Sequence, residues 1–348
     1  MTVERMEELL AQFPHISLAV VGDFFLDKYL ILEQALTEVS LETGLDAYQV
    51  VGKRCSPGAA GTVTNNLSAL EVGRIRAVGC IGEDGEGFEL RRGLEQRRVD
   101  MTHLFGHPDW FTPTYTKPML RDASGRESEL NRLDIKNRAP TPREIEDGIL
   151  AELERVLPKV QAVVVLDQIA QRDLGVVTDR VRAGIQNLAK EHPDVVFFAD
   201  SRENIGLFRD VTIKPNKLEA ARSCGYEGTE EALTAEDAQR FGAQLVARNG
   251  RPAFVTAGVE GIVVFDGTAA RRVPGVRVPP PVDIVGAGDS TTAGIVAALC
   301  AGATLHEAAV MGNCVASITV QQLGTTGTAT REQVSRRFRE HVGQFEGL

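Results

Sequence analysis

The chain has 348 residues, of which 43% are hydrophobic and 25% are charged, and its formal net charge at pH 7 is −10. This length and apolar content allow a large core, either in one big α/β domain or in two smaller ones. The negative charge argues against a nucleic-acid-binding protein or a protein that binds anionic membranes, although a local basic pocket could still bind an anionic metabolite.

The first segment, "MTVERMEELLAQF", carries charges throughout and predicts a short amphipathic helix rather than a signal peptide. Five cysteines are scattered along the sequence without CxxC spacing. No run of about 18 apolar residues occurs, so we expect no membrane span. We therefore expect a cytoplasmic protein with reduced thiols, no disulfide framework and no zinc site.

Apolar segments that end in polar residues recur along the chain and predict parallel strands covered by helices on both faces. These segments are residues 16–23, 161–168, 194–201, 211–216 and 252–267. Helical patterns alternate with them at about 143–157, 173–191, 217–223, 235–249 and 286–301. The alternation predicts an α/β fold, a three-layer α/β/α sandwich with a mostly parallel central sheet.

Ligands of such sheets bind at the carboxyl ends of the strands, so polar side chains at these ends are expected to face a site. They are Asp23, Asp27, Asp167, Asp200 and Asn216. Residues 28–54 and 112–135 are strand-like, are enriched in Thr, Tyr and Val, and lack long helical patterns. We expect them to form a small antiparallel β lid on a single domain that spans residues 1–348.

The segment "VDIVGAGDSTTAGIVAAL" at 282–299 places an acid beside a Gly-Ala-Gly turn at the predicted start of a helix. Gly286 and Gly288 permit a tight turn, and the free N–H groups of a helix start bind phosphate. Gly286, Ala287 and Gly288 would form the anion hole, and Asp289 would accept a proton from an attacking hydroxyl. We expect the helix dipole to lower the pKa of Asp289, which a loose transition state tolerates. The alternative is an ordinary helix cap.

Five segments in order resemble the signatures of the ribokinase-like, PfkB-type carbohydrate kinases. They are "VVGDFFLD", "PGAAGTVTNNLSALEVGRIRAVGCIGEDGEG", "KPNKLEA", "VTAGVEGIVVFDG" and "DIVGAGD", the last with Ile284 in place of the usual Thr. The resemblance covers roughly residues 16–330. It implies a ribokinase-like fold, a sugar or sugar-phosphate acceptor, the cofactors ATP and Mg²⁺, and in some members a monovalent cation such as K⁺.

Two further segments, "TYTKPMLRDASGRESELNRLDI" and "MGNCVASITVQQLGTTGTAT", look most like the subgroup that phosphorylates heptose 7-phosphate in bacterial ADP-heptose synthesis. We expect the nucleotidyltransferase domain of the bifunctional heptose enzyme to be absent from this sequence. The resemblance also implies a homodimer formed through the lid.

The resemblance assigns roles to individual residues of this sequence. Catalysis is assigned to Asp289 with Gly286, Ala287 and Gly288. Acceptor binding is assigned to Asp27, Gly58, Ala59, Thr62, Lys117 and Arg132, the last two on a phosphate that the acceptor already carries. ATP binding is assigned to Arg202, Asn216, Glu219, Thr256, Gly258, Gly261 and Asn313. Asn216 and Glu219 would also hold Mg²⁺ through water, and Asp283 would lie beside the monovalent cation.

The sequence departs from the family pattern on the acceptor side. Ala59 and Thr62 stand where the first signature usually has Gly and Asn, and Met119 stands where the heptose subgroup has Arg. The acceptor therefore stays open between heptose 7-phosphate, another sugar such as ribose or fructose, and a nucleoside. A non-catalytic sugar or nucleotide sensor on a kinase fold is the alternative from another functional class. Asn216 and Glu219 also fit a plain capping box.

Overall fold

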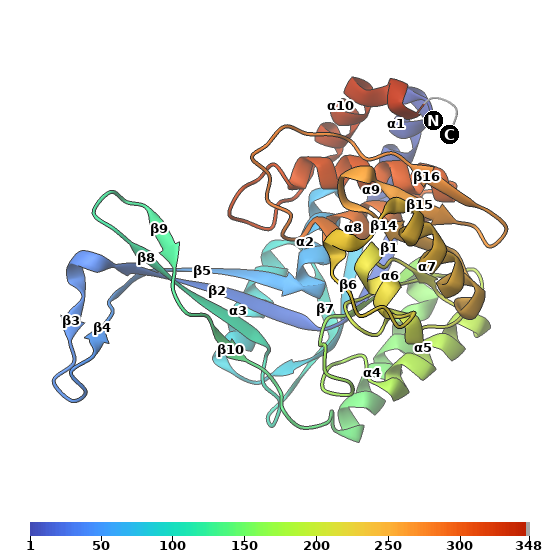
Figure 1. Cartoon of the computed structure of the whole chain (residues 1–348). Coiled ribbons are helices and arrows are strands. Elements are labelled where there is room, and N and C mark those ends of the chain that lie inside the picture. The colour runs from blue at the N-terminus through green and yellow to red at the C-terminus, as the bar shows by residue number, and fades with distance from the viewer. Residues whose placement is uncertain (346–348) are drawn as a thin grey trace.

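The computed structural model describes residues 1–345, which form a large body and a β arm that projects from it (Figure 1). The strands are β1 (Ser17–Gly22), β2 (Phe24–Glu33), β3 (Glu38–Val39), β4 (Asp46–Ala47), β5 (Val50–Ala59), β6 (Arg74–Gly82), β7 (Asp100–His107), β8 (Thr114–Arg121), β9 (Glu127–Glu129), β10 (Leu133–Ile135), β11 (Ala162–Asp167), β12 (Val196–Ser201), β13 (Thr212–Ile213), β14 (Ala253–Thr256), β15 (Ile262–Phe265) and β16 (Ala270–Val273). The α-helices are α1 (Val3–Gln12), α2 (Ala60–Ala69), α3 (Gly85–Gln96), α4 (Arg143–Val156), α5 (Asp179–Glu191), α6 (Lys217–Arg222), α7 (Ala235–Asn249), α8 (Ala287–Cys300), α9 (Leu305–Thr319) and α10 (Arg331–His341).

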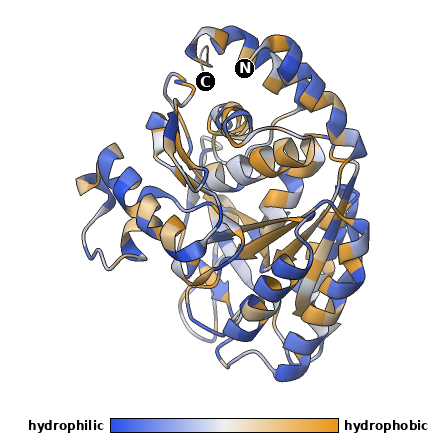
Figure 2. Cartoon of the chain, turned by 90° about the vertical axis from the view of Figure 1, so that its right-hand side faces the viewer, coloured by the Kyte–Doolittle hydropathy of each residue, from blue (hydrophilic) through white to orange (hydrophobic). Residues whose placement is uncertain are grey.

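A nine-stranded sheet runs through the body in the order β16-β15-β14-β13-β12-β11-β1-β6-β7. All neighbouring strands from β14 to β7 pair in parallel, whereas β15 and β16 are antiparallel to their neighbours. Leu18 and Val20 of β1 pack into one core, and Ala19 and Val21 pack into the core on the other face. Figure 2 shows the apolar strands enclosed by helices with hydrophilic outer surfaces. The predicted α/β/α sandwich is therefore confirmed.

Two predicted elements differ in detail from the structure. The segment 252–267 contains two antiparallel strands, β14 and β15, because Gly258 and Gly261 adopt left-handed backbone angles (φ of 58° and 95°) and turn the chain between them. The helix predicted from residue 173 begins only at Asp179, since the Thr178 side chain accepts the N–H of Val181 and caps the helix there.

The helices separate into two groups, one on each face of the sheet. Helices α4, α5, α6 and α7 cover one face, and α2, α3, α8 and α9 cover the other, with α1 and α10 packed together beyond them (Figure 1). Helix α8 packs between α2 and α9, and its residues 290–298 are all buried. Within residues 1–345, no helix is both long and apolar enough to cross a membrane.

A second sheet, which we call the lid sheet, has the strand order β10-β8-β2-β5, with β9 paired to β8. It forms the projecting arm, and the β3–β4 hairpin lies at its far end (Figure 1). Strand β2 is antiparallel to β5 but parallel to β8, so the layer is mixed rather than antiparallel throughout. The lid sheet also begins earlier than expected, since β2 follows β1 after a single residue, Asp23.

Candidate active site

The start of α8 forms a glycine turn at the surface of an otherwise buried helix. Gly286 caps the helix with a φ of 79°, in the left-handed region that favours glycine. The N–H of Ala287 donates to the carbonyl oxygen of Ile284 at 3.1 Å. Within the described part of the chain, the N–H groups of Gly288 and Asp289 donate to no protein acceptor. The N–H of Gly286 also has no acceptor among these residues, so the free donors are those of Gly286, Gly288 and Asp289, whereas Ala287 does not contribute the donor that was predicted for it.

A buried lysine lies over this helix start. Lys214 follows β13, is 3% exposed, and places its Nζ 3.0 Å from Oδ2 of Asp200. A Cβ added to Gly288 would lie 3.7 Å from this Nζ and would meet no other heavy atom within 4 Å. The Lys214 amino group is thus the nearest non-neighbouring group above Gly288 at the helix start.

Lys214 is a buried charged residue beside the candidate site that the sequence motifs did not identify. Lysine is almost never fully buried unless it is paired, and here its partner is a carboxylate at the end of the neighbouring strand β12. The signal in the sequence was a lysine placed directly before the Pro-Asn turn, in a segment that otherwise reads as a buried strand. Burial lowers the pKa of Lys214, but the charges of Asp200 and Glu219 outweigh it and raise the pKa, so the amino group is positively charged.

Three carboxyl groups gather around this amino group, from Asp200, Glu219 and Asp289. Burial and the charge of Asp200 raise the pKa of Asp289 to about 7, although Lys214 and Arg202 oppose the shift. The same two causes raise the pKa of Glu219 to about 7. The prediction that the helix start lowers the pKa of Asp289 is therefore wrong, because burial and like charge outweigh the helix dipole. Thr292 of α8 donates to Asp200 at 2.8 Å and holds it in place.

Asn216 and Glu219 form a capping box at the start of α6. The Glu219 N–H donates to Oδ1 of Asn216 at 2.8 Å, and the Asn216 N–H donates to Oε2 of Glu219 at 2.7 Å. The plain capping interpretation is thus correct, and it leaves Oε1 of Glu219 without a hydrogen bond among the described residues. An acidic cluster with one free carboxylate oxygen fits a Mg²⁺ ion held mainly through its waters.

Of the remaining residues predicted on the nucleotide side, Thr256 and Arg202 lie beside this cluster, whereas Gly261 and Asn313 lie against the end of β16. Thr256 pairs with Asn216 as an isolated bridge, and Arg202 directly follows β12, where its charge acts on both Asp289 and Glu219. Gly261 packs so closely that a Cβ would overlap the carbonyl oxygen of Val273. Asn313 of α9 donates to the carbonyl oxygens of Val273 and Pro274 at 3.4 and 3.0 Å, so its amide hydrogens are already used.

On the acceptor side, the charge of Asp27 of β2 contributes to the raised pKa of Asp289. Burial raises the pKa of Asp27 itself, and Lys117 opposes this effect with its Nζ 3.6 Å from Oδ1 of Asp27. A Cβ at Gly58 would lie 2.5 Å from Oδ2 of Asp27, so glycine is required beside this carboxylate.

Thr62, Ala59 and Arg132 complete the predicted acceptor residues. Thr62 of α2 faces the turn of α8, with its Cγ2 3.6 Å from the position of a Cβ on Gly286. Ala59 caps α2 with φ 52° and ψ −117°, a conformation that costs a residue with a Cβ. Arg132 is held by Asp134 through two hydrogen bonds of 2.6 and 2.8 Å.

Two of the predicted strand-end residues do not face the site. Asp23 and Asp167 are each 3% exposed. Asp23 accepts three backbone N–H groups from the loop after β11, those of Gln168, Ile169 and Val176 at 2.7–3.3 Å. Asp167 accepts hydrogen bonds from the side chains of Ser201 and Asn204 at 2.8 and 3.1 Å. The prediction that both face a site is wrong, because their carboxylates instead hold the segments that follow the strands.

The loop after α9 lies against the segment that leads into α8. Asp283 accepts the N–H groups of Val285 at 3.0 Å and of Gly324 at 3.1 Å, and it donates its own N–H to the carbonyl oxygen of Val320 at 2.7 Å. The structure therefore brings Asp283, the residue predicted beside a monovalent cation, together with the backbone of Val285 and Gly324. Both Asp283 oxygens already accept a hydrogen bond, so backbone carbonyl groups would supply most of the ligands.

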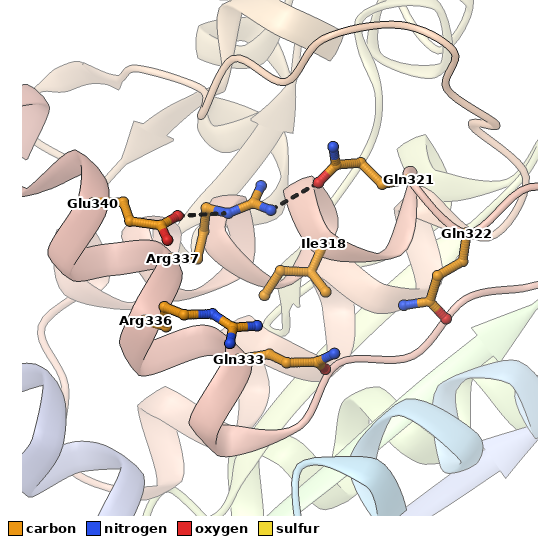
Figure 3. Close-up of a pocket in the computed structure, with 7 residues that line it drawn as sticks. All are labelled: Ile318, Gln321, Gln322, Gln333, Arg336, Arg337 and Glu340. Carbon is orange, nitrogen blue, oxygen red and sulfur yellow. Dashed lines mark hydrogen bonds and ion pairs between the residues drawn. The ribbon is translucent and has the colours of Figure 1, made fainter.

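A separate cavity of about 330 Å³ lies between α9 and α10 and contains none of the predicted site residues (Figure 3). Arg337 crosses it, donating to Ser317 at 3.0 Å and to Gln321 at 2.7 Å, with Glu340 at 3.8 Å. Because its guanidinium group is already satisfied, this arginine ties α10 to α9, and the cavity is not the site of the chemistry.

Comparisons with known proteins agree with this geometry. Residues 54–331 match the pfkB family carbohydrate kinase model. The bifunctional protein HldE of Gluconobacter oxydans is 28% identical over 333 residues, which are 95% of this chain and 66% of that protein. The HldE of a Nitratiruptor species is 30% identical over 319 residues, which are 90% of this chain and 63% of that protein. The chain thus spans slightly less than two thirds of these relatives.

Solved structures show the same fold. Arabidopsis thaliana ribokinase, in a complex with ribose and ATP, has a TM-score of 0.68 at 18% identity, over 93% of this chain and 99% of that chain. Escherichia coli phosphofructokinase-2, with substrates and products, has a TM-score of 0.68 at 19% identity and the same coverage. The predicted ribokinase-like fold is confirmed. Since the family model matches more than half of the chain, this protein belongs to the pfkB family of carbohydrate kinases and is a sugar kinase.

Proposed function

We propose that this sugar kinase transfers the γ-phosphoryl group of ATP to a hydroxyl of a phosphorylated sugar, and that heptose 7-phosphate is the first acceptor to test. One observation carries the proposal. The free N–H groups at Gly288 and Asp289 lie at the helix start below the buried Lys214 amino group, with the Asp289 carboxyl group beside it. Preorganised donors of this kind stabilise charge that develops on a phosphoryl group.

Asp289 acts as the general base in this proposal. A pKa of about 7 allows the carboxylate to accept a proton from the acceptor hydroxyl near neutral pH. Asp27 accepts hydrogen bonds from other hydroxyl groups of the sugar and orients it, since an ionised carboxylate is a pure acceptor. Lys214 pairs with the transferred phosphoryl group. Its amino group does not have to move to do so, because Asp200, itself held by Thr292, keeps it in position.

ATP is supported as the donor by the ribokinase complex with ribose and ATP that shares this fold. Arg202, Thr256 and Gly258 would contact its phosphates, and Asn313 would lie near its base. Asn216 and Glu219 would hold Mg²⁺ through water, and the ion would screen the charges of the phosphate groups. We expect Glu219→Gln to raise the Mg²⁺ concentration needed for half-maximal rate more than it raises the KM for the sugar.

The acceptor is proposed from two independent lines of support. The HldE relatives span nearly the whole chain, and Lys117 and Arg132 lie on the lid sheet near Asp27. A screen of sugars and sugar phosphates by coupled ADP release tests the proposal, with Asp289→Asn as the inactive control. Faster turnover of heptose 7-phosphate than of the unphosphorylated heptose supports it. Turnover of neutral sugars alone would exclude a phosphorylated acceptor and leave a kinase of plain sugars.

We also propose that the protein is a homodimer that associates through the lid sheet. Four large apolar side chains near the β3–β4 hairpin are 50–104% exposed, namely Leu36, Val39, Leu41 and Leu45. Exposed apolar groups gathered on one projecting element are typical of an interface. Sedimentation of the wild type and of a Leu41→Asp, Leu45→Asp variant tests this, and a monomeric wild type would contradict it.

A further inference from the structure

A row of three side chains crosses the lid sheet two residues beyond Asp27. The strand register places Tyr29 of β2 between Arg54 of β5 and Lys117 of β8. Arg54 Cζ lies 5.4 Å from the centre of the Tyr29 ring, and Lys117 Nζ lies 4.9 Å from it. Lys117 also donates to the Tyr29 hydroxyl at 3.2 Å. Two cations therefore share one aromatic ring.

This row lies on the face of the lid sheet that is turned toward the reaction centre. Tyr29 shares a face with Asp27, because alternate residues of a strand point the same way. The opposite face is covered by α3, whose Glu86 pairs with Lys28 at 2.8 Å. The face that carries Asp27 and Tyr29 is therefore the one that α3 leaves free, and it is the face whose Asp27 charge acts on Asp289.

The distance between the rows limits the length of the acceptor that can contact both Asp27 and the two cations. Two residues of a strand advance by about 7 Å, so the Arg54–Tyr29–Lys117 row begins about 7 Å beyond Asp27. A sugar that binds Asp27 through its hydroxyl groups would present the substituent on its far carbon to this row. The next row on the same face, Ile31 with Gly52 and Met119, carries no charge. Cations therefore lie at the Asp27 row, where Arg132 and Lys136 contact the Tyr115 ring, and at the Tyr29 row, and they stop there, which suits one anionic group at the far end of the acceptor.

Arg54 is able to change partners at little cost. Its side chain is 57% exposed and pairs with Glu127 at 3.0 Å. Glu127 also pairs with Arg121 at 3.3 Å, so it keeps a cation when Arg54 leaves. An exposed ion pair of this kind contributes little to stability. Lys117 is more confined, since it is 19% exposed and lies 3.6 Å from Asp27.

We infer that Arg54 is a specificity-determining residue that turns from Glu127 to the terminal phosphate of the acceptor, with Tyr29 as its platform and Lys117 as the second cation. The inference rests on the proposed function, because it requires an acceptor that is oriented by Asp27. It adds a charged residue of β5, the strand that also carries Gly58 and Ala59, to the groups that select the acceptor. Guanidinium and phosphate groups match in geometry, which favours Arg54 over a point charge.

The test compares Arg54→Ala, Arg54→Lys and the wild type on paired acceptors: heptose 7-phosphate with heptose, and fructose 6-phosphate with fructose. Arg126→Ala is the matched control, since it removes the same charge from an exposed position between β8 and β9. We expect Arg54→Ala to raise the KM for the phosphorylated acceptor by about tenfold or more, and Arg54→Lys to recover part of this loss. The kcat, the KM for ATP and the KM for the neutral sugar should stay within about twofold.

Equal changes for phosphorylated and neutral acceptors, or the same changes in Arg126→Ala, would overturn the role of Arg54. Turnover of neutral sugars alone would also overturn it and would leave the sugar kinase intact. If no sugar supports ADP release, the proposed function fails separately. Calorimetric binding of the same sugar phosphates to the wild type and Arg54→Ala then decides the role of Arg54, and equal or absent binding would overturn it.

Discussion

The start of α8 and the lid sheet both carry many charges, but the charges at the start of α8 are buried and those on the lid sheet are mostly exposed to solvent. At the start of α8, Lys214 and Asp200 are 3% and 6% exposed, and buried carboxyl groups there have pKa values near 7. On the lid sheet, Arg54 and Arg132 are largely exposed and pair with acids that lie within the same sheet.

This difference separates the chemistry of the reaction from the choice of acceptor. Buried charges interact strongly, and removing one member of a pair leaves the other unpaired at a large penalty, so the α8 start suits a step that every sugar kinase must perform. Exposed pairs exchange partners cheaply, so the lid sheet can be altered for a new acceptor without loss of the fold. Substitutions in the two regions should therefore differ sharply in size of effect.

The largest effect is expected at Asp289. Asp289→Asn removes the proton acceptor and should lower kcat by about 10²–10⁴-fold while the KM for ATP changes little, because general-base catalysis contributes about this much. Steady-state ADP release measures both constants. A kcat within threefold of the wild type would show that Asp289 is not the base.

Substitution of Lys214 should lower both the activity and the stability of the protein. Lys214→Met leaves Asp200 buried without its cation, and breaking such a pair costs about 3–5 kcal/mol of unfolding free energy. We expect kcat to fall by about 10²-fold, since one preorganised donor to the reacting group is lost. Denaturant unfolding and ADP release measure the two effects.

The double variant Lys214→Met, Asp200→Asn is the control for this prediction. It removes both charges, so most of the lost stability should return while kcat stays low. If kcat recovers together with stability, Lys214 is needed only to hold the fold.

Residues at the start of α8 should also affect the pH dependence of kcat and of unfolding free energy more strongly than residues on the lid sheet. Asp289 must be ionised to accept a proton, so kcat should rise through about pH 7 and then level off. Stability should depend on pH through the same carboxyl group. In the folded protein the pKa of Asp289 is about 7, above the ordinary value of 3.8.

The stability that the Asp289 carboxyl group contributes is therefore fully present below pH 3.8 and is lost as the pH rises through about 7. Asp289→Asn should weaken this loss, and unfolding measured across the pH range checks it. An unchanged pH profile in the variant would assign the effect to another group.

The smallest effect is expected at Ala59, where the lid sheet joins α2. Its φ of 52° and ψ of −117° suit glycine, so Ala59→Gly should stabilise the protein by about 1 kcal/mol or more, with little change in kcat. Thermal unfolding measures the gain, and Ala60→Gly, one residue into α2, serves as a control that should destabilise. A loss of stability in Ala59→Gly would show that the backbone carries no strain there.

The sequence by itself determined the layers of the fold and the position of the glycine turn at the start of α8. Alternating strand and helix patterns are local properties of the chain, and the glycines of "GAGD" limit the backbone to a turn wherever the helix packs. The capping box at Asn216 and Glu219 was readable for the same reason, since its hydrogen bonds span only three residues.

Only the tertiary structure decided which charges meet. Lys214 and Asp200 are 14 positions apart but occupy the ends of neighbouring strands, and Arg54 meets Lys117 only because β5 and β8 both flank β2. Asp23 and Asp167 looked equally well placed at strand ends, yet the carboxylate of Asp23 accepts hydrogen bonds from loop N–H groups and that of Asp167 accepts one from a side chain. The raised pKa of Asp289 likewise depends on burial and on Asp200, which come from distant parts of the chain. Local patterns specify which groups are present, whereas long-range packing sets their distances and burial, and these determine their chemistry.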